Sequence, residues 1–267
     1  MAIHSKMNQD DMFIDEVLSF YKEHGRHDLI WRKKITAYRI LVSEVMLQQT
    51  QVIRVIDKFN EWMKLYPTLK ELRTASLQDV LILWQGLGYQ RRAKALYEIA
   101  KNYTTIPKTF SELCDLPGVG SYTASAVCAF AYDAFTYPVL ETNIRTVLID
   151  EFHLDKNEIH DGLLYDDLDR LSKNSKVQDV GARVWYYALM DYGAYLKEHN
   201  ISHNKKSKHY SKQSAYKGSL RELRAKTLFA VTYKKELPED ERLSDVLFAL
   251  EKEGYIIKRG AKYIIKE

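Results

Sequence analysis

Apolar side chains recur at helical spacing along most of this chain, and this periodicity limits the folds open to it. The pattern is clear in MFIDEVLSFYKEHG (12–25), in the long stretch 37–67, in SLQDVLILWQG (76–86) and in QRRAKALYEIAKNY (90–103). Short turns with glycine, proline or serine separate these segments. Because no strands alternate with helices, we predict an all-α fold for residues 1–200.

Two details of this helical pattern stay open. The stretch 37–67 is either one long helix or two abutting helices, ended by Pro67. Further helices are expected in TFSELCDL (109–116), SYTASAVCAFAYD (121–133), TNIRTVLIDEFHL (142–154), LLYDDLDRLSKN (163–174) and ARVWYYALMDYGAYLKEH (182–199).

The C-terminal quarter has a different composition. Residues 201–218 (ISHNKKSKHYSKQSAYKG) are polar and basic, and we interpret them as a linker. Two helical segments (219–233 and 242–254) and a hairpin turning at Gly260 follow. Helix, helix and two-stranded wing is the layout of a winged-helix module, which we predict for residues 219–267. Modules of this shape commonly bind nucleic acid, and some bind other proteins.

Positive charge is concentrated in the same quarter. From Lys197 onward there are 17 lysines and arginines against 10 acidic residues, although the whole chain carries only +4. Between Lys205 and Lys226 there are eight basic residues and one acid. Such a block indicates a solvated tail or a surface for a polyanion. Lys205, Lys206 and Lys208 are the candidate DNA contacts in it.

Composition excludes several protein classes. A hydrophobic content of 46% supports a packed core, and no run of 18 apolar residues or signal-peptide pattern is present. We therefore expect a soluble cytoplasmic protein. Its two cysteines, Cys114 and Cys128, are too few for a disulfide framework or a four-cysteine metal site. Buried, inert thiols are the expected interpretation.

The stretch LPGVGSYTA (116–124) places two glycines at the start of a predicted helix. Glycine lets a backbone approach another group closely, and N–H groups at a helix N-terminus attract anions such as phosphate. A tight turn between two helices explains the same residues without any ligand.

Five motifs point to one family by their order and approximate spacing. They are LVSEVMLQQTQV (41–52), LWQGLGYQRRAKAL (83–96), LPGVGSYTASAV (116–127), YPVLETNIRTVL (137–148) and ALMDYGA (188–194). Over roughly residues 26–196 the chain resembles the helix-hairpin-helix DNA glycosylases of the endonuclease III superfamily. Within the superfamily it is most similar to the MutY-type adenine glycosylases.

The resemblance implies a set of DNA contacts. Backbone amides of the hairpin would hold a DNA phosphate, at Leu116, Gly118, Val119, Gly120 and Ser121. Side chains that wedge the duplex open would come from Gln48, Gln49 and Tyr89, with Gln49 filling the gap that the extruded base leaves. Without the family, QQ reads as a polar helix face and Tyr89 as a core ring.

The same resemblance implies the catalytic residues. Glu44 matches the acid that protonates N7 of adenine, and its apolar neighbours would desolvate the carboxyl and favour its protonated form. Glu141 stands in LETN where the family has an aspartate that stabilises the cationic sugar. Asn143 would orient this region, and Tyr122 and Arg32 match positions beside the two carboxylates. Because Tyr122 replaces the nucleophilic lysine of bifunctional relatives, no β-lyase activity is expected.

Two departures from the family concern its cofactor and its C-terminus. The family's four-cysteine iron–sulfur cluster follows the segment that matches MDYGA, but no cysteine lies there, so we predict no cluster. His199 and His203 are at i and i+4, a spacing that zinc sites use, but without a nearby carboxylate or thiol pair no metal is predicted. The tail after Ser219 is also too short for the Nudix-like domain that recognises 8-oxoguanine.

Together these features predict a two-subdomain, monofunctional DNA glycosylase that removes a mispaired base in base excision repair. Adenine is the favoured base, and thymine or uracil in a mismatch is the alternative. A DNA-binding relative without catalysis is the rival of another class, because LETN departs from the motif. The expected partner is duplex DNA with a mismatched or damaged base, without a membrane, and the expected state is a monomer. In a prokaryote the protein would be associated with the nucleoid.

Overall fold

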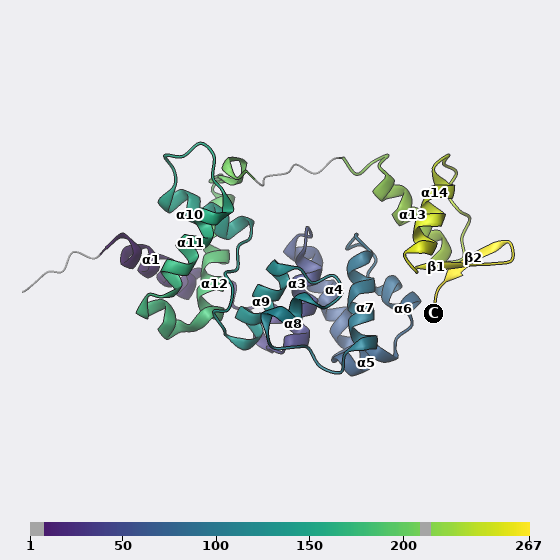
Figure 1. Cartoon of the computed structure of the whole chain (residues 1–267), viewed down its shortest axis with the longest axis horizontal. Coiled ribbons are helices and arrows are strands. Elements are labelled where there is room, and N and C mark those ends of the chain that lie inside the picture. The colour runs from purple at the N-terminus through teal and green to yellow at the C-terminus, as the bar shows by residue number, and fades with distance from the viewer. Residues whose placement is uncertain (1–7, 209–214) are drawn as a thin grey trace, which may run out of the picture. The chain divides into compact units, whose positions relative to one another are not determined.

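The computed structural model describes residues 8–208 and 215–267, and most of them are helical (Figure 1). Contacts between Cα atoms divide the chain into two compact units. Unit 1 comprises Met1–Leu41, Pro107–Asp115 and Val119–Ser211, and unit 2 comprises Val42–Ile106, Leu116–Gly118 and Lys212–Glu267. The all-α class predicted for residues 1–200 is confirmed for the described part of that range, and the C-terminal part adds a small two-stranded sheet. Boundaries at residues 200 and 218 stay a prediction, and residues 209–214 of the expected linker lie outside the described ones.

Unit 1 is built around one long helix. Its elements are α1 (Gln9–His24), α2 (Ile30–Lys33), the first part of α3 (Ala37–Leu47), α8 (Phe110–Cys114), α9 (Ser121–Tyr132), α10 (Thr142–Phe152), α11 (Asp161–Ser172), α12 (Ser175–Glu198) and the 3-10 turn η1 (Asn204–Lys206). Helix α12 packs against both α1 and α10 (Figure 1). The ring of Phe13 on α1 meets Trp185 on α12 and Phe152 on α10 edge to face, so aromatic side chains join these three helices.

Helix starts in unit 1 follow local signals in the sequence. The side chain of Asn8 accepts a hydrogen bond from the Asp11 amide, and Asn174 does the same for Lys176. Each bond satisfies an amide that has no partner within its helix. Thr109 caps the short helix α8 in the same way.

Unit 2 contains the rest of α3, and then α4 (Val52–Leu65), α5 (Leu69–Thr74), α6 (Leu77–Leu83), α7 (Arg91–Asn102), α13 (Leu220–Thr232), α14 (Leu243–Lys252), β1 (Ile256–Arg259) and β2 (Lys262–Ile265). Trp62 and Trp84 are fully buried, with ring centroids 5.8 Å apart. The stretch 37–67 is two helices, because the chain breaks between Leu47 and Val52.

The last two strands form the predicted hairpin. They pair antiparallel, with Ile256 opposite Ile265 and Arg259 opposite Lys262, and Gly260 lies in the turn. Ile256 and Ile265 are buried, so one face of the hairpin packs inward against α13 and α14. The order helix, helix, hairpin is as expected, and its winged-helix character stays a prediction.

Candidate functional site

Two turns in unit 2 hold the residues that were predicted to wedge DNA. Gln49 lies in the turn between α3 and α4 with φ = 53°, and Tyr89 lies before α7 with φ = 47°. Non-glycine residues rarely adopt this left-handed conformation, because the Cβ atom crowds the backbone. Among the described residues five non-glycine residues have positive φ, and these are two of them. Strain of this kind gathers where a structure holds a side chain in one defined position.

Arg92 holds both turns in place. Its Nη1 donates to the carbonyls of Val45 (2.8 Å), Met46 (3.1 Å) and Gln48 (2.6 Å) at the end of α3. Its Nη2 donates to the carbonyls of Leu87 (2.7 Å) and Gly88 (3.1 Å) beside Tyr89. These carbonyls lie at a helix end and in a turn, where helical partners are missing.

Burial of the Arg92 guanidinium is the main reason why its pKa falls to about 10. The sequence analysis did not single out this residue. Its only signal there was an arginine within the RRAKAL segment, on the face that also carries Ala93 and Leu96.

Glu44 lies on α3 and is 6% exposed, between the buried residues Val42 and Val45. The burial expected for this carboxyl from ILVSEVML is therefore present. A carboxyl removed from water in this way is suited to hold and donate a proton. Its role as the acid stays a prediction.

The turn between α8 and α9 is a helical hairpin that depends on glycine. Gly118 has φ = 71°, and a Cβ atom there would lie 2.7 Å from the Cβ of Ala95. Gly120 is the N-cap of α9 and offers no capping side chain. Of the predicted phosphate contacts, Leu116 and Val119 bury their side chains, whereas Gly118, Gly120 and Ser121 are exposed. A helix start with exposed residues suits an anion, and the phosphate contact itself stays a prediction.

Glu141 is the N-cap of α10. Its Oε1 accepts hydrogen bonds from the amides of Asn143 (2.8 Å) and Ile144 (2.9 Å), and the Thr142 hydroxyl donates to Oε2 (3.2 Å). A carboxylate at this end of a helix is stabilised by the helix dipole. The LETN motif therefore fixes both the position and the orientation of this carboxylate.

A lysine that the sequence analysis missed completes this cluster. Lys197 on α12 donates from Nζ to Asn143 Oδ1 (2.7 Å) and to Thr142 Oγ1 (3.1 Å). Burial lowers the pKa of Lys197, while the negative charge of Glu141 acts in the opposite direction. The structure thus brings Glu141, Asn143 and Lys197 together in unit 1.

Gly193 explains why α12 can approach this cluster. A Cβ atom at this position would lie 2.3 Å from the carbonyl oxygen of Asn143. The glycine of MDYGA therefore allows close contact between α12 and the first turn of α10.

Arg32 lies in a buried ion pair that has its own structural role. It donates to both oxygens of Asp191, at 2.7 and 3.0 Å, and its guanidinium lies 4.0 Å from the ring centroid of Tyr187. Arg26 contacts the same carboxylate through Nε at 2.8 Å. Burial alone would raise the pKa of Asp191, but Arg32 and Arg26 outweigh it and hold that pKa below its usual range.

The predicted catalytic residues divide between the units. Arg32, Tyr122, Glu141 and Asn143 belong to unit 1, and Glu44 belongs to unit 2 together with Gln48, Gln49 and Tyr89. Tyr122 lies partly exposed in the first turn of α9. The roles predicted for Arg32 and Tyr122 stay predictions, and Asp191 was not identified from the sequence.

The segment after α12 does not fit a four-cysteine cluster. The chain has two cysteines, and both precede residue 129. Side-chain hydrogen bonds attach the segment to α10. His203 Nε2 lies 2.8 Å from Asp150 Oδ1, and Asn204 Nδ2 donates to Thr146 Oγ1. Across residues 8–208 and 215–267, no group of three or more His, Cys, Asp or Glu side chains is placed to hold a metal.

The three candidate lysines of this segment differ in their surroundings. Lys205 and Lys208 are exposed, and Lys208 lies 3.9 Å from a carboxylate oxygen of Glu158. Lys206 is half-buried, and its Nζ donates to the carbonyl of Leu154 at 2.9 Å. Lys206 therefore also helps to fix the segment. Across the whole described part, no helix has the length and apolar character needed to span a membrane.

Residues 42–174 match the HhH-GPD superfamily of base excision DNA repair proteins, and over this domain the chain belongs to that superfamily. Two relatives with curated descriptions are more particular, because both are adenine DNA glycosylases. The protein of Mycolicibacterium smegmatis is 45% identical over 144 residues, and that of Rattus norvegicus is 43% identical over 150 residues. The predicted resemblance is thereby confirmed.

These matches cover only part of each protein. They span 52% and 51% of this chain, and 48% and 29% of the two relatives. A longer match, 32% identical over 186 residues, spans 53% of the adenine DNA glycosylase of Buchnera aphidicola subsp. Baizongia pistaciae. The chain thus spans about half or less of the length of these curated relatives.

Solved structures agree on the fold. A thermostable thymine-DNA glycosylase superposes with a TM-score of 0.60 at 21% identity, over 74% of this chain and 92% of that one. Endonuclease III from a non-covalent DNA complex gives 0.55 at 17% identity, over 71% and 87%. At these identities the likeness establishes the architecture.

Proposed function

We propose that this chain is a monofunctional DNA glycosylase that excises adenine from mispaired positions in duplex DNA. The observation that carries the proposal is the buried carboxyl of Glu44, which lies within the residues that match the superfamily. The adenine specificity is supported by relatives with 41–45% identity, all of them adenine DNA glycosylases.

Two carboxyls would divide the work of breaking the N-glycosidic bond. Glu44, in its desolvated setting, would donate a proton to N7 of the departing adenine. Glu141 would place negative charge near the sugar as positive charge develops there. Its bonds to two backbone amides hold it in position before the reaction, so little reorganisation is needed.

The strained turns would extrude the base. Unstacking costs a few kcal/mol and leaves a gap that a side chain must fill. Gln49 and Tyr89 lie on turns that Arg92 holds rigidly, which suits a wedge. Exposed amides of the hairpin at Gly118, Gly120 and Ser121 would bind a phosphate without reading sequence.

The remaining parts of the proposal concern chemistry and setting. Tyr122 cannot form a Schiff base, so strand cleavage is not expected. The enzyme would work without an iron–sulfur cluster, as a monomer in the cytoplasm, with mismatched duplex DNA as its partner.

The decisive test is excision by Glu44→Gln on duplexes that contain A·G, A·C, A·8-oxoguanine, T·G or U·G pairs. The variant should lose adenine excision by at least 100-fold, the low end of what general acid catalysis contributes, and should still bind the duplex. Glu23→Gln, at an exposed position, is the matched control and should act as wild type.

The same panel separates the other candidates. Excision of thymine or uracil in place of adenine would favour the alternative of a mismatch thymine or uracil glycosylase. A wild type that binds every duplex and excises nothing would favour the catalytically inactive relative. The motivation for that alternative is the natural residue Glu141 in LETN, where the resemblance implies an aspartate.

A further inference from the structure

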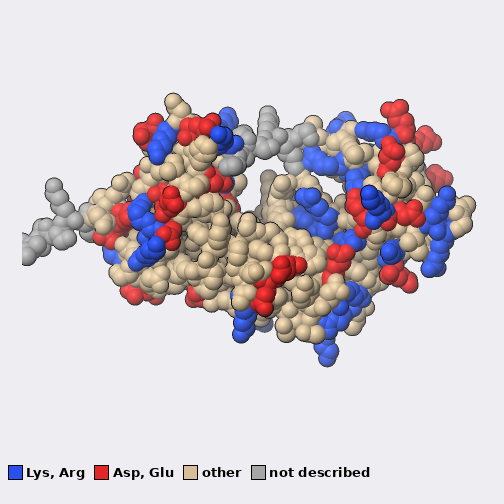
Figure 2. Space-filling view, in the orientation of Figure 1, with Lys and Arg blue, Asp and Glu red and all other residues tan. Residues whose placement is uncertain are grey.

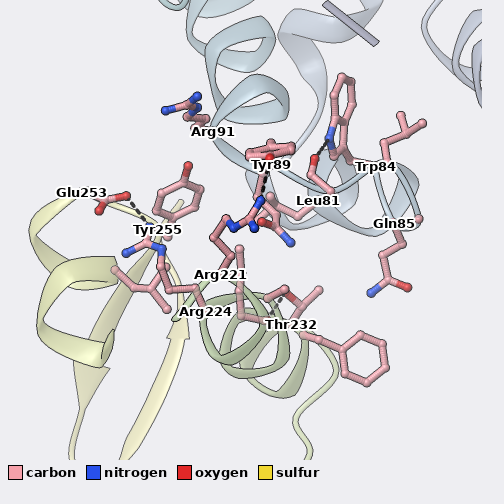
Figure 3. A pocket seen from close by; sticks show the side chains of 18 of the residues that line it. Leu81, Trp84, Gln85, Tyr89, Arg91, Arg221, Arg224, Thr232, Glu253 and Tyr255 are labelled. Carbon is pink, nitrogen blue, oxygen red and sulfur yellow. Dashed lines mark hydrogen bonds and ion pairs between the residues drawn. The ribbon is translucent and has the colours of Figure 1, made fainter. Parts of the chain in front are cut away.

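A large cleft lies within unit 2, outside the catalytic residues described above. It has a volume of about 1010 Å³ and is bounded by the turn Gly86–Arg91 on one side and by α13 on the other (Figure 3). Small-ligand pockets run from about 300 to 1,000 Å³, so this cleft has room for more than one small ring system.

Both walls of the cleft belong to the same unit. Gln78 on α6 donates from Nε2 to the carbonyl of Thr232 on α13 at 3.1 Å. Lys94 on α7 lies 5.7 Å from the ring centroid of Tyr255, which leads into the C-terminal hairpin. The C-terminal module is therefore joined to α6 and α7 by direct contacts.

The lining of the cleft is strongly basic. Four arginines contribute to it: Arg54, Arg91, Arg221 and Arg224. Among the described residues of the lining, Glu253 is the one acid, and it pairs with Arg224 at 2.7 Å. Figure 2 shows lysines and arginines, with some acids, over this part of the chain. The cleft therefore favours an anionic occupant.

Aromatic rings lie between these arginines. Trp84 and Tyr255 are buried in the wall, whereas Tyr89 and Tyr216 are accessible. The Arg91 guanidinium lies 5.8 Å from the centroid of the Tyr89 ring. Arginines that alternate with accessible aromatic rings are the composition of sites for unpaired nucleic-acid strands, which use phosphate contacts and base stacking together.

Arg221 connects the C-terminal module to the strained turn. Its Nη1 donates to the hydroxyl of Tyr89 at 2.9 Å (Figure 3). Tyr89 is thus held from two sides, by Arg92 through the neighbouring carbonyls and by Arg221 through its own hydroxyl. The ring is fixed at the cleft, as a stacking platform requires.

We propose that this cleft binds an unpaired stretch of a DNA strand, with phosphates on Arg54, Arg91 and Arg221 and a base stacked against Tyr89. The choice of DNA as the polymer rests on the proposed function. The site itself lies beyond it, because it assigns a strand-binding role to α13 and the C-terminal module.

The test measures binding by the full chain, not excision. Fluorescence anisotropy would compare a labelled oligo-dT strand, a duplex with a three-nucleotide bulge and the same duplex fully paired. The double variant Arg54→Gln/Arg91→Gln should bind the strand and the bulged duplex at least 10-fold more weakly, with a smaller change on the paired duplex. For the single strand, the slope of log K against log salt should shrink by about 0.7 for each arginine.

The matched control is Arg259→Gln/Lys262→Gln. It removes two exposed charges of the C-terminal β1–β2 hairpin, and neither residue lines the cleft. It should change every affinity by less than 2-fold. Because Arg54 and Arg91 are exposed, their substitution should leave thermal unfolding unchanged. Tyr89→Leu is the second variant, and it should weaken strand binding by roughly 5-fold or more through lost stacking.

The inference is overturned if the arginine double variant binds the strand as tightly as the control does. It is also overturned if that variant loses equal affinity for all three DNAs, since this would indicate a general surface charge. Its failure is separable from that of the proposed function. If the wild type excises adenine but the arginine variant binds DNA normally, the cleft proposal alone is refuted. If the arginine variant selectively loses strand binding but the wild type excises nothing, the glycosylase assignment alone is refuted.

Discussion

Asp191 is the residue on which the buried charges of unit 1 depend. Its side chain is 1% exposed and balances two guanidinium groups, those of Arg26 and Arg32. Asp191→Asn would leave these two positive charges without compensation. We expect a loss of about 3–5 kcal/mol in the free energy of unfolding, measured in urea at pH 7.

The pH dependence of stability should carry the same signature. Because the folded pKa of Asp191 lies below its unfolded value near 3.9, its stabilisation is complete above that value. It is lost as the pH falls through the folded pKa. Asp191→Asn should therefore show a shallower loss of stability below about pH 4. Asp169→Asn, which breaks an exposed pair with Lys173, is the control and should cost at most about 1 kcal/mol. Equal effects of the two substitutions would contradict this account.

Glu141 allows the charge and the length of its side chain to be tested separately. Glu141→Gln keeps an oxygen that can cap α10 but removes the charge, so the fold should survive. If the carboxylate faces the cationic sugar, adenine excision should become slower. Its activation free energy should rise by about 3–4 kcal/mol, the contribution of one well-placed electrostatic group. Single-turnover kinetics on an adenine mismatch measures this.

Glu141→Asp restores the family's residue and tests whether the site is adapted to the longer side chain. We expect lower activity, because the glutamate side chain has the length with which its carboxylate accepts hydrogen bonds from the amides of Asn143 and Ile144. The aspartate side chain is one methylene shorter. Greatly increased excision would mean instead that the natural protein is impaired or has another substrate.

At the scale of elements, the hairpin between α8 and α9 combines a positive φ and a close contact at one glycine, Gly118. Gly118→Ala forces a left-handed alanine and brings its Cβ atom to 2.7 Å from that of Ala95. The two effects together should lower the free energy of unfolding by roughly 1–3 kcal/mol. Gly120→Ala is the matched control, because φ is −95° there and no atom lies within 4 Å of the added Cβ. Thermal unfolding of both variants decides the matter, and equal losses would show that the turn tolerates a side chain at either position.

Elements were predictable from the sequence where local signals fix them. Apolar spacing and the terminal Gly25 identified α1, and the two apolar runs on either side of Gly260 identified the C-terminal hairpin. The break between α3 and α4 was left open because it depends on a strained Gln49. Arg92 stabilises that turn from 44 or more residues away, and sequence periodicity contains no information about such a partner.

The candidate site shows the same limit. Glu44 and Glu141 were identified because their motifs are local. Lys197 and Asp191 were not, because each acts through a contact that exists only in the packed helices of unit 1. Gly193 was part of a recognised motif, but its reason, contact with the Asn143 backbone, required the structure.

For the molecule as a whole, the uneven distribution of charge matters more than the net value of +4. Lysines and arginines that neutralise the phosphates of a duplex release its counterions. The slope of log K against log salt is then about −0.9 for each phosphate contact. The segment after α12 carries part of this positive charge. Lys205 and Lys208 present that charge to solvent, whereas Lys206 is engaged with Leu154.

Lys205→Gln/Lys208→Gln should therefore weaken binding to every duplex by a similar factor, matched or mismatched. The slope of log K against log salt should shrink by up to about 1.8, because two phosphate contacts are lost. Leaving Lys206 in place keeps its bond to Leu154, so a loss of affinity would not reflect unfolding of the segment. Lys22→Gln/Lys173→Gln removes the same charge from exposed positions on α1 and directly after α11, and is the matched control. Fluorescence anisotropy between 50 and about 200 mM salt, the range over which such contacts are resolved, gives both slopes. If the two double variants have equal slopes, net charge alone governs binding and the segment after α12 does not contact DNA.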